Sequence, residues 1–250
     1  MEWSDRGIVL AARPHGESGA VIHVLCQEQG RFAGMLHGAQ SSRRRGLSEP
    51  GTMVQAHWQA RLADHLGNWQ LESTRQFAAE LLDEPLRLAG LQAVCSLAQE
   101  ALPEREPHED VFFATEALLN TFDGEFWAPV LIKWETKLLE SLGFGLDLTK
   151  CAATGSTENL CFVSPKSGRA VSAEGAGPYK ERLLPLPGFL IGQGDASPER
   201  VVEGLRLTAH FLQKHVFDVT NRPLPVARIR FQDSYSRFAG TSGTVDAPDD

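Results

Sequence analysis

Two hydrophobic periods follow one another along this sequence, and the change between them is the strongest constraint on its fold. In the segment 52–60, Val54 and Trp58 alternate with the polar residues Gln55 and His57. A period of two predicts a β-strand with one buried face. Beyond residue 76 the period becomes three to four residues, which is typical of a helix.

Five segments share the β-type pattern, and turn-forming residues separate them. They are 6–13, 20–26, 31–37, 52–60 and the stretch around Trp69 and Leu71. No helical spacer lies between them, and so many short strands in so short a stretch favour a small barrel over alternating strands and helices.

The remainder predicts a helical bundle interrupted by an irregular insert. Apolar stripes run through 88–102, 111–122, 127–142 and 201–216, and Ser197 with Pro198 is a good start for the last helix. Residues 144–196 show neither period, and within them residues 147–190 predict a loop-rich insert. Residues 239–250 predict a disordered tail.

The totals exclude some classes of protein. No run of about 18 apolar residues exists, so no membrane span is expected. The first residues resemble no secretory signal, which predicts a cytoplasmic protein. The net charge of −8 argues weakly against nucleic-acid binding, but acidic residues concentrate in 76–125, and the local field decides how a polyanion binds.

Arginines in the first 75 residues are the leading candidates for a binding site. Arg43, Arg44 and Arg45 are consecutive in a polar loop between predicted strands. Guanidinium groups beside a barrel could hold a phosphate backbone. The surface that binds phosphates could extend to other arginines on the strands: Arg6, Arg13 and Arg31. The alternative is a solvated charged loop.

Aromatic residues of the same region could stack on bases, but a core position is favoured. Phe32, Trp58 and Trp69 fall at the buried positions of the alternation.

No constellation indicates catalysis, a cofactor or a metal. Cys151 and Cys161 have no partners at zinc-ribbon spacing. The phosphate-loop pattern is absent, GQGDAS at 192–197 reads as a loop before a helix, and Ser18 reads as a turn residue. We therefore expect no enzyme activity, no cofactor and no bound metal.

Two further basic sets could receive an acidic partner peptide. Lys133 and Lys137 lie four residues apart on a predicted helix, and the second set is Arg222, Arg228 and Arg230. For each set taken alone, a solvated basic face is favoured at least equally.

Three stretches in this order resemble the RecO family of bacterial recombination mediators. They are GIVLAARPHGESGAVIHVLCQEQGRFAGMLHGAQSSRRR, WETKLLESLGFGLDLTKC and the last helix running to NRPL. The resemblance implies an α+β multidomain chain: an oligonucleotide-binding (OB) fold β-barrel in 1–75, and a helical domain in 76–238 carrying a zinc-ribbon-like insert.

The resemblance also implies a function. Such a protein would bind single- and double-stranded DNA and anneal complementary strands. With RecR it would help to load RecA onto DNA covered by single-strand DNA-binding protein, whose acidic tail some members receive. This implies a nucleoid-associated protein. The alternative from another class is a protein-interaction adaptor whose barrel does not bind DNA.

One departure from the family pattern concerns zinc. Many members carry four cysteines in the insert, whereas here Cys151 stands at the first place and Thr154-Gly155 at the next. The second pair is replaced by polar residues around SPKSGRAVS. We expect a degenerate, metal-free insert held by Leu160, Phe162 and Val163.

Overall fold

The structure, a computed structural model, describes residues 1–41, 44–62 and 64–242. It combines a β-barrel with helices and divides into two compact units. The first unit is Met1–Asp123 with Pro225–Arg228, and the second is Gly124–Leu224 with Ile229–Asp250. No helix in the described ranges is long and apolar enough to cross a membrane.

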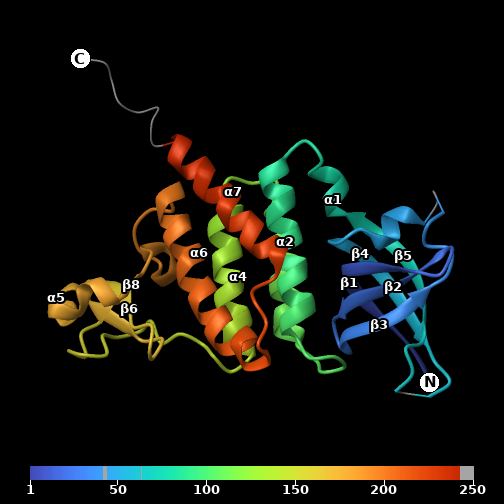
Figure 1. Ribbon diagram of the computed structural model, residues 1–250, viewed down its shortest axis with the longest axis horizontal. Helices are drawn as coiled ribbons and strands as arrows, with labels where there is room; N and C mark the ends of the chain where they lie inside the picture. Colours follow the sequence, from blue (N-terminus) through green and yellow to red (C-terminus); the bar gives the residue numbers. More distant parts are fainter. Residues whose placement is uncertain (42–43, 63, 243–250) are drawn as a thin grey trace, which may run out of the picture. The chain divides into compact units, whose positions relative to one another are not determined.

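The first unit begins with the closed barrel that the alternation predicts (Figure 1). Its five strands are β1 (Glu2–His15), β2 (Gly19–Cys26), β3 (Gly30–Leu36), β4 (Thr52–Gln59) and β5 (Asn68–Gln76). Their order around the barrel is β1-β2-β3-β5-β4, and β1 pairs with β4 to close it. The β3–β5 pair is parallel and the other pairs are antiparallel. This is the five-stranded arrangement of an OB-like barrel.

The long first strand makes closure possible. The early part of β1 pairs with β4, from Glu2 opposite Gln59 to Ile8 opposite Met53. Pairing with β2 starts at Gly7 and shifts register between Val9 and Ala11. A register shift of this kind bends a strand and increases its twist, so one strand can serve both edges of the sheet.

The barrel interior is filled by alternating apolar side chains, including the three aromatics predicted for the core. Phe32, Trp58 and Trp69 are 6, 0 and 3% exposed. The indole of Trp58 donates a 3.1 Å hydrogen bond to the carbonyl of Leu66. A Cβ on Gly34 would lie 2.7 Å from the indole nitrogen of Trp69, so only glycine fits there. The core assignment of these rings is confirmed.

Three helices complete the first unit. They are α1 (Phe77–Glu80), α2 (Pro85–Ala101) and α3 (Glu109–Leu119). A proline at the first position suits the start of α2, because no intrahelical partner awaits its nitrogen. The predicted stripe of α2 is buried, with Leu91 and Cys95 at 0 and 1% exposure, and α2 contacts β1 and β2.

The second unit is built around two helices, α4 (Trp127–Ser141) and α6 (Pro198–Leu212). They approach closely at Gly204, where a Cβ would meet the side chain of Ile132 at 2.8 Å. One π-helical turn, η4 (Gln213–Phe217), and one 3-10 turn, η5 (Asp218–Thr220), follow α6.

The last helix, α7 (Val226–Ser242), belongs to the second unit from residue 229 onward. Its Phe231 and Tyr235 rings lie 5.8 and 6.1 Å from the ring of Trp127. The tail predicted for 239–250 begins inside this helix, while residues 243–250 lie outside the described residues.

The insert of the second unit contains more regular structure than its sequence indicated. A three-stranded sheet has the order β7-β6-β8, and five elements run through the segment: β6 (Leu160–Val163), β7 (Ala170–Ser172), β8 (Leu184–Pro185), α5 (Ala173–Ala176) and η2 (Gly177–Arg182). A short turn, η3 (Gly188–Ile191), leads out of it. Leu160 and Val163 are buried as predicted, whereas Phe162 is only half-buried.

Candidate nucleic-acid interface

Three connections come together at one end of the barrel. The turn after β1 meets the β3–β4 loop where the amide of Gln40 donates to the carbonyl of Ser18 at 3.3 Å. The end of β3 meets the β4–β5 loop where the amide of Met35 donates to the carbonyl of Gly67 at 2.9 Å. Such loops flank the ligand face of OB-folds, so we call this end, with its three connections, the loop end.

Two described arginines at the loop end, Arg13 and Arg44, are exposed, and so is Arg45, which follows Arg44 and lines a cavity with Gln76 at the opposite end of β5. None of these three arginines forms an ion pair within the described ranges. The guanidinium of Arg44 donates a 2.6 Å hydrogen bond to the carbonyl of His37, which orients it over the loop. Arg43 lies outside the described residues. Unpaired guanidinium groups in one region create a positive local field for a phosphate backbone.

Arg6 differs from these, because an intramolecular partner holds it. Its guanidinium pairs with the carboxylate of Glu116 on α3. It also lies 5.6 Å from the centre of the Phe112 ring and 3.4 Å from the side-chain oxygen of Gln27. This arginine connects the barrel to α3 within the first unit.

Arg31 is held more firmly still. Its side chain is only 12% exposed, its Nε donates to the carbonyl of Leu102 at 2.8 Å, and its Nη1 pairs with Glu104 at 3.1 Å. The pKa of His23 lies below its ordinary value because the imidazole is partly buried and because the Arg31 guanidinium lies beside it. A neutral histidine next to this pair adds no positive charge to the face.

Two further arginines lie near the loop end that the sequence patterns did not single out. Arg61 lies in the β4–β5 loop and is exposed. Its position in the sequence, between the last two predicted strands, could have marked it as a candidate for phosphate binding. Arg105 comes from the α2–α3 connection, donates to the carbonyl of His65 at 3.0 Å and lies 5.3 Å from the Phe32 ring centre. No local pattern could place Arg105 there, since it reaches the barrel by tertiary contact.

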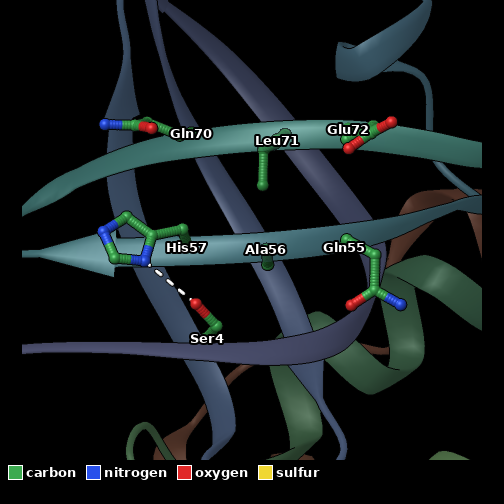
Figure 2. Close-up of a pocket in the computed structure, with 7 residues that line it drawn as sticks. All are labelled: Ser4, Gln55, Ala56, His57, Gln70, Leu71 and Glu72. Carbon is green, nitrogen blue, oxygen red and sulfur yellow. Dashed lines mark hydrogen bonds between the residues drawn. The ribbon is translucent and has the colours of Figure 1, made fainter.

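A polar groove of about 330 Å³ lies on the outer face of β1, β4 and β5 (Figure 2). The imidazole Nδ1 of His57 and the hydroxyl of Ser4 are 3.0 Å apart. Gln55 on β4, with Gln70 and Glu72 on the neighbouring strand, completes its polar lining. No arginine or lysine is among the residues that line the groove, so it lacks the side chains that would bind a phosphate backbone.

The residues predicted to meet a partner protein are in unequal positions. Lys133, Arg222 and Arg230 are exposed, and Lys137 pairs with Glu140 at 3.2 Å on its own helix. Arg228 is fully buried, so the structure does not present it at a surface, contrary to the position that partner contact requires. Sequence alone read it as one more member of a basic segment.

The insert holds one unusual thiol. The sulfur of Cys151 is buried and accepts hydrogen bonds from the amide and hydroxyl of Ser172 at 3.2 and 3.3 Å and from the amide of Thr154 at 3.4 Å. Burial by itself raises the pKa of this thiol, but the donors outweigh it and lower the pKa to about 6.

The other insert cysteine is separate from it. Cys161 is exposed, with its thiol directed at the carbonyl of Asn159 at 3.1 Å. Among the described residues no group of three or more His, Cys, Asp or Glu side chains could hold a metal ion. The metal-free insert stays a prediction.

The fold and the loop end define a class: an OB-like barrel with a basic rim, joined to a helical unit. Family models described as "Recombination protein O N terminal" and "Recombination protein O C terminal" match residues 1–77 and 82–222. The chain therefore belongs to the RecO family of DNA repair proteins, as the sequence resemblance indicated.

Individual relatives agree over nearly the full length. A DNA repair protein RecO of Rhodospirillum centenum is 51% identical over 250 residues, covering 99% of this chain and 100% of the relative. That of Cereibacter sphaeroides is 47% identical over 238 residues, covering 95 and 99%. That of Rhodospirillum rubrum is 47% identical over 247 residues, covering 96 and 98%.

Proposed function

We propose that this chain is a non-enzymatic recombination mediator that binds single- and double-stranded DNA through the loop end of its barrel. The observation that carries the proposal is the group of exposed arginines, Arg13, Arg44 and Arg45, left without ion pairs in the described ranges. Membership of a DNA repair family supports the same ligand.

The mechanism is charge neutralisation. Each guanidinium that contacts a phosphate releases condensed counterions, which favours binding at low salt. Two strands held on one basic surface repel each other less, so complementary strands can anneal without any bond being made or broken. Arg6 and Arg31 support this surface by holding the barrel against its neighbouring segments.

The partners of this activity belong to the proposal as well. With RecR, the protein would help to load RecA onto DNA covered by single-strand DNA-binding protein, in the cytoplasm at the nucleoid. The exposed residues Lys133, Arg222 and Arg230 are the candidates for contact with the acidic tail of the single-strand DNA-binding protein.

The decisive experiment is a fluorescence-anisotropy titration of a labelled single-stranded oligonucleotide across a salt series. The triple variant Arg13→Ala, Arg44→Ala, Arg45→Ala should bind weakly, and its slope of log affinity against log salt should be smaller by about 2, or about 0.7 for each lost phosphate contact. Arg200→Ala, which removes an exposed arginine of α6 paired with Glu203, is the matched control and should bind like the wild type.

Two outcomes would count against the proposal. Wild-type protein that does not bind even at low salt would leave the adaptor function in its place. A triple variant with unchanged affinity and slope would move the DNA site away from the loop end.

A further inference from the structure

A second cavity of the first unit, which we call the η1 pocket, lies beside the β3–β4 loop that carries Arg44. It is enclosed by the 3-10 turn η1 (Arg45–Ser48), by α1 and by α2, and its volume is about 350 Å³. Its floor is apolar: Leu91 is fully buried, while Leu82 is 70% exposed and Leu88 half-buried. A cavity of this size can hold a planar organic group.

The wall formed by η1 is fixed to the barrel. The hydroxyl of Thr52 on β4 donates a 3.0 Å hydrogen bond to the carbonyl of Gly46. A Cβ on Gly46 would lie 2.8 Å from the side-chain amide nitrogen of Gln76, so the missing side chain leaves room for the Gln76 amide beside η1. The pocket is therefore formed before any ligand arrives.

Polar groups stand at the edge of the apolar floor. Gln92 offers an amide donor group and an acceptor and makes no hydrogen bond with other described residues, whereas the amide of Gln76 already donates to the hydroxyl of Ser73 at 3.4 Å. The exposed carboxylate of Glu49 offers two more acceptor oxygens. Amides and a carboxylate can read the hydrogen-bonding edge of a nucleobase, in the way they read base edges in DNA grooves.

The positive charge beside the pocket indicates which kind of molecule would carry the planar group. Arg45, exposed and lining the pocket, directly follows Arg44 of the proposed phosphate track. A ligand with regularly spaced anions and flat, edge-polar groups fits both features at once, and single-stranded DNA is such a ligand. An apolar side chain of a partner protein would leave the amides and the carboxylate unused.

We infer that the η1 pocket receives one unpaired nucleobase of the strand whose phosphates the loop end holds, an inference that rests on the proposed function. The base lies on Leu82 and Leu88, its edge meets the side-chain amide of Gln92, and Arg45 contacts an adjacent phosphate. A base within a duplex must first leave its stack and its pairing partner, so the pocket favours single strands over duplexes.

The test combines a pocket variant with an oligonucleotide variant. Leu82→Ser removes an exposed apolar wall and leaves every charge in place, and Gln92→Leu removes an exposed amide at similar size. Each should weaken binding of single-stranded DNA about tenfold, because Leu82→Ser removes apolar contact with the base and Gln92→Leu removes a hydrogen bond to its edge. Neither should change the salt slope. Val219→Ser, at an apolar side chain of η5 that is 76% exposed, is the control.

An abasic oligonucleotide of the same length supplies the second arm. Wild-type protein should bind it about tenfold more weakly than the normal strand, and Leu82→Ser should cause no further loss. A 2-aminopurine base in the normal strand should change its fluorescence on binding to wild type and less so with Leu82→Ser.

The outcomes separate this inference from the proposed function. If wild type binds and both pocket variants bind equally well with the same 2-aminopurine response, no base enters the pocket and a protein partner becomes its candidate occupant. If both variants also lose salt slope, they act through the phosphate track and the inference fails. If wild type does not bind DNA, both proposals fail together.

Discussion

The guanidinium of Arg31 on β3 forms a 3.1 Å ion pair with Glu104 and a 2.8 Å hydrogen bond with the carbonyl of Leu102. Both partners belong to the segment that follows α2. The amide of Arg105 in turn donates to the carbonyl of Arg31 at 2.8 Å, so backbone and side chain of one residue hold this segment to the barrel.

Truncating Arg31 should therefore cost stability more than DNA affinity. Arg31→Ala removes a largely buried charged donor and should lower the free energy of unfolding by about 1–3 kcal/mol. Chemical denaturation measures this loss. Arg200→Ala is the matched control, because the Arg200–Glu203 pair is 52 and 27% exposed and should contribute less than about 1 kcal/mol. Equal losses in the two variants would contradict the structural role of Arg31.

The pair Arg6–Glu116 should show a measurable coupling. A double-mutant cycle of Arg6→Ala and Glu116→Ala should give an interaction energy of about 0.2–1 kcal/mol at low salt, because Arg6 is 42% exposed. The coupling should shrink as salt screens the charges. Strictly additive losses at low salt would show that the pair is not formed in solution.

Glycine is required at position 30 for two reasons. Its φ is +74°, and a Cβ there would lie 1.9 Å from the carbonyl oxygen of Glu106. Gly30→Ala should cost about 1–2 kcal/mol for the left-handed backbone and about 1–3 kcal/mol more for the displaced segment. Thermal unfolding measures the sum.

The control for that variant is Gly16→Ala. Gly16 has a φ of +65° but nothing within 4 Å of its added Cβ, so only the backbone cost of about 1–2 kcal/mol applies. If Gly30→Ala is no less stable than Gly16→Ala, then Glu106 does not lie as close to β3 as the structure shows.

Cys151 should make stability depend on pH. Its folded pKa of about 6 lies below the ordinary value, so between about 6 and about 8.5 the unfolded thiol holds a proton that the folded one has released. Its contribution is complete above the unfolded pKa and is lost as pH falls through about 6. Urea unfolding of wild type and Cys151→Ala across this range measures the difference.

In Cys151→Ala this part of the pH dependence should disappear. Cys161→Ala, at the exposed thiol, should keep it. A wild-type profile that matches Cys151→Ala at every pH would show that the Ser172 and Thr154 donors do not stabilise a thiolate.

Local patterns predicted the long elements well and the short ones poorly. Five strands and the helices α2, α3, α4 and α6 agree with the periods, because each buries one face over several repeats. The strands of the insert are two to four residues long, too short for any period to develop. The helix α7 was missed because its basic residues were interpreted as a binding segment.

The sequence did not predict the order of the strands around the barrel. The alternation predicts strands but not their neighbours, and β3 meets β5 through the single pair Met35 opposite Asn68. That parallel contact crosses the whole β3–β4 loop and strand β4, so no hairpin signal announces it.

By itself, the sequence determined which segments become strands and helices and which residues carry positive charge. Only the tertiary structure decided which of those charges remain available. The partner of Arg31 lies 73 residues away in the chain and that of Arg6 lies 110 residues away, whereas Arg13, Arg44 and Arg45 meet no acid within the described ranges. Ion pairing falls off with distance in space, and folding alone sets that distance.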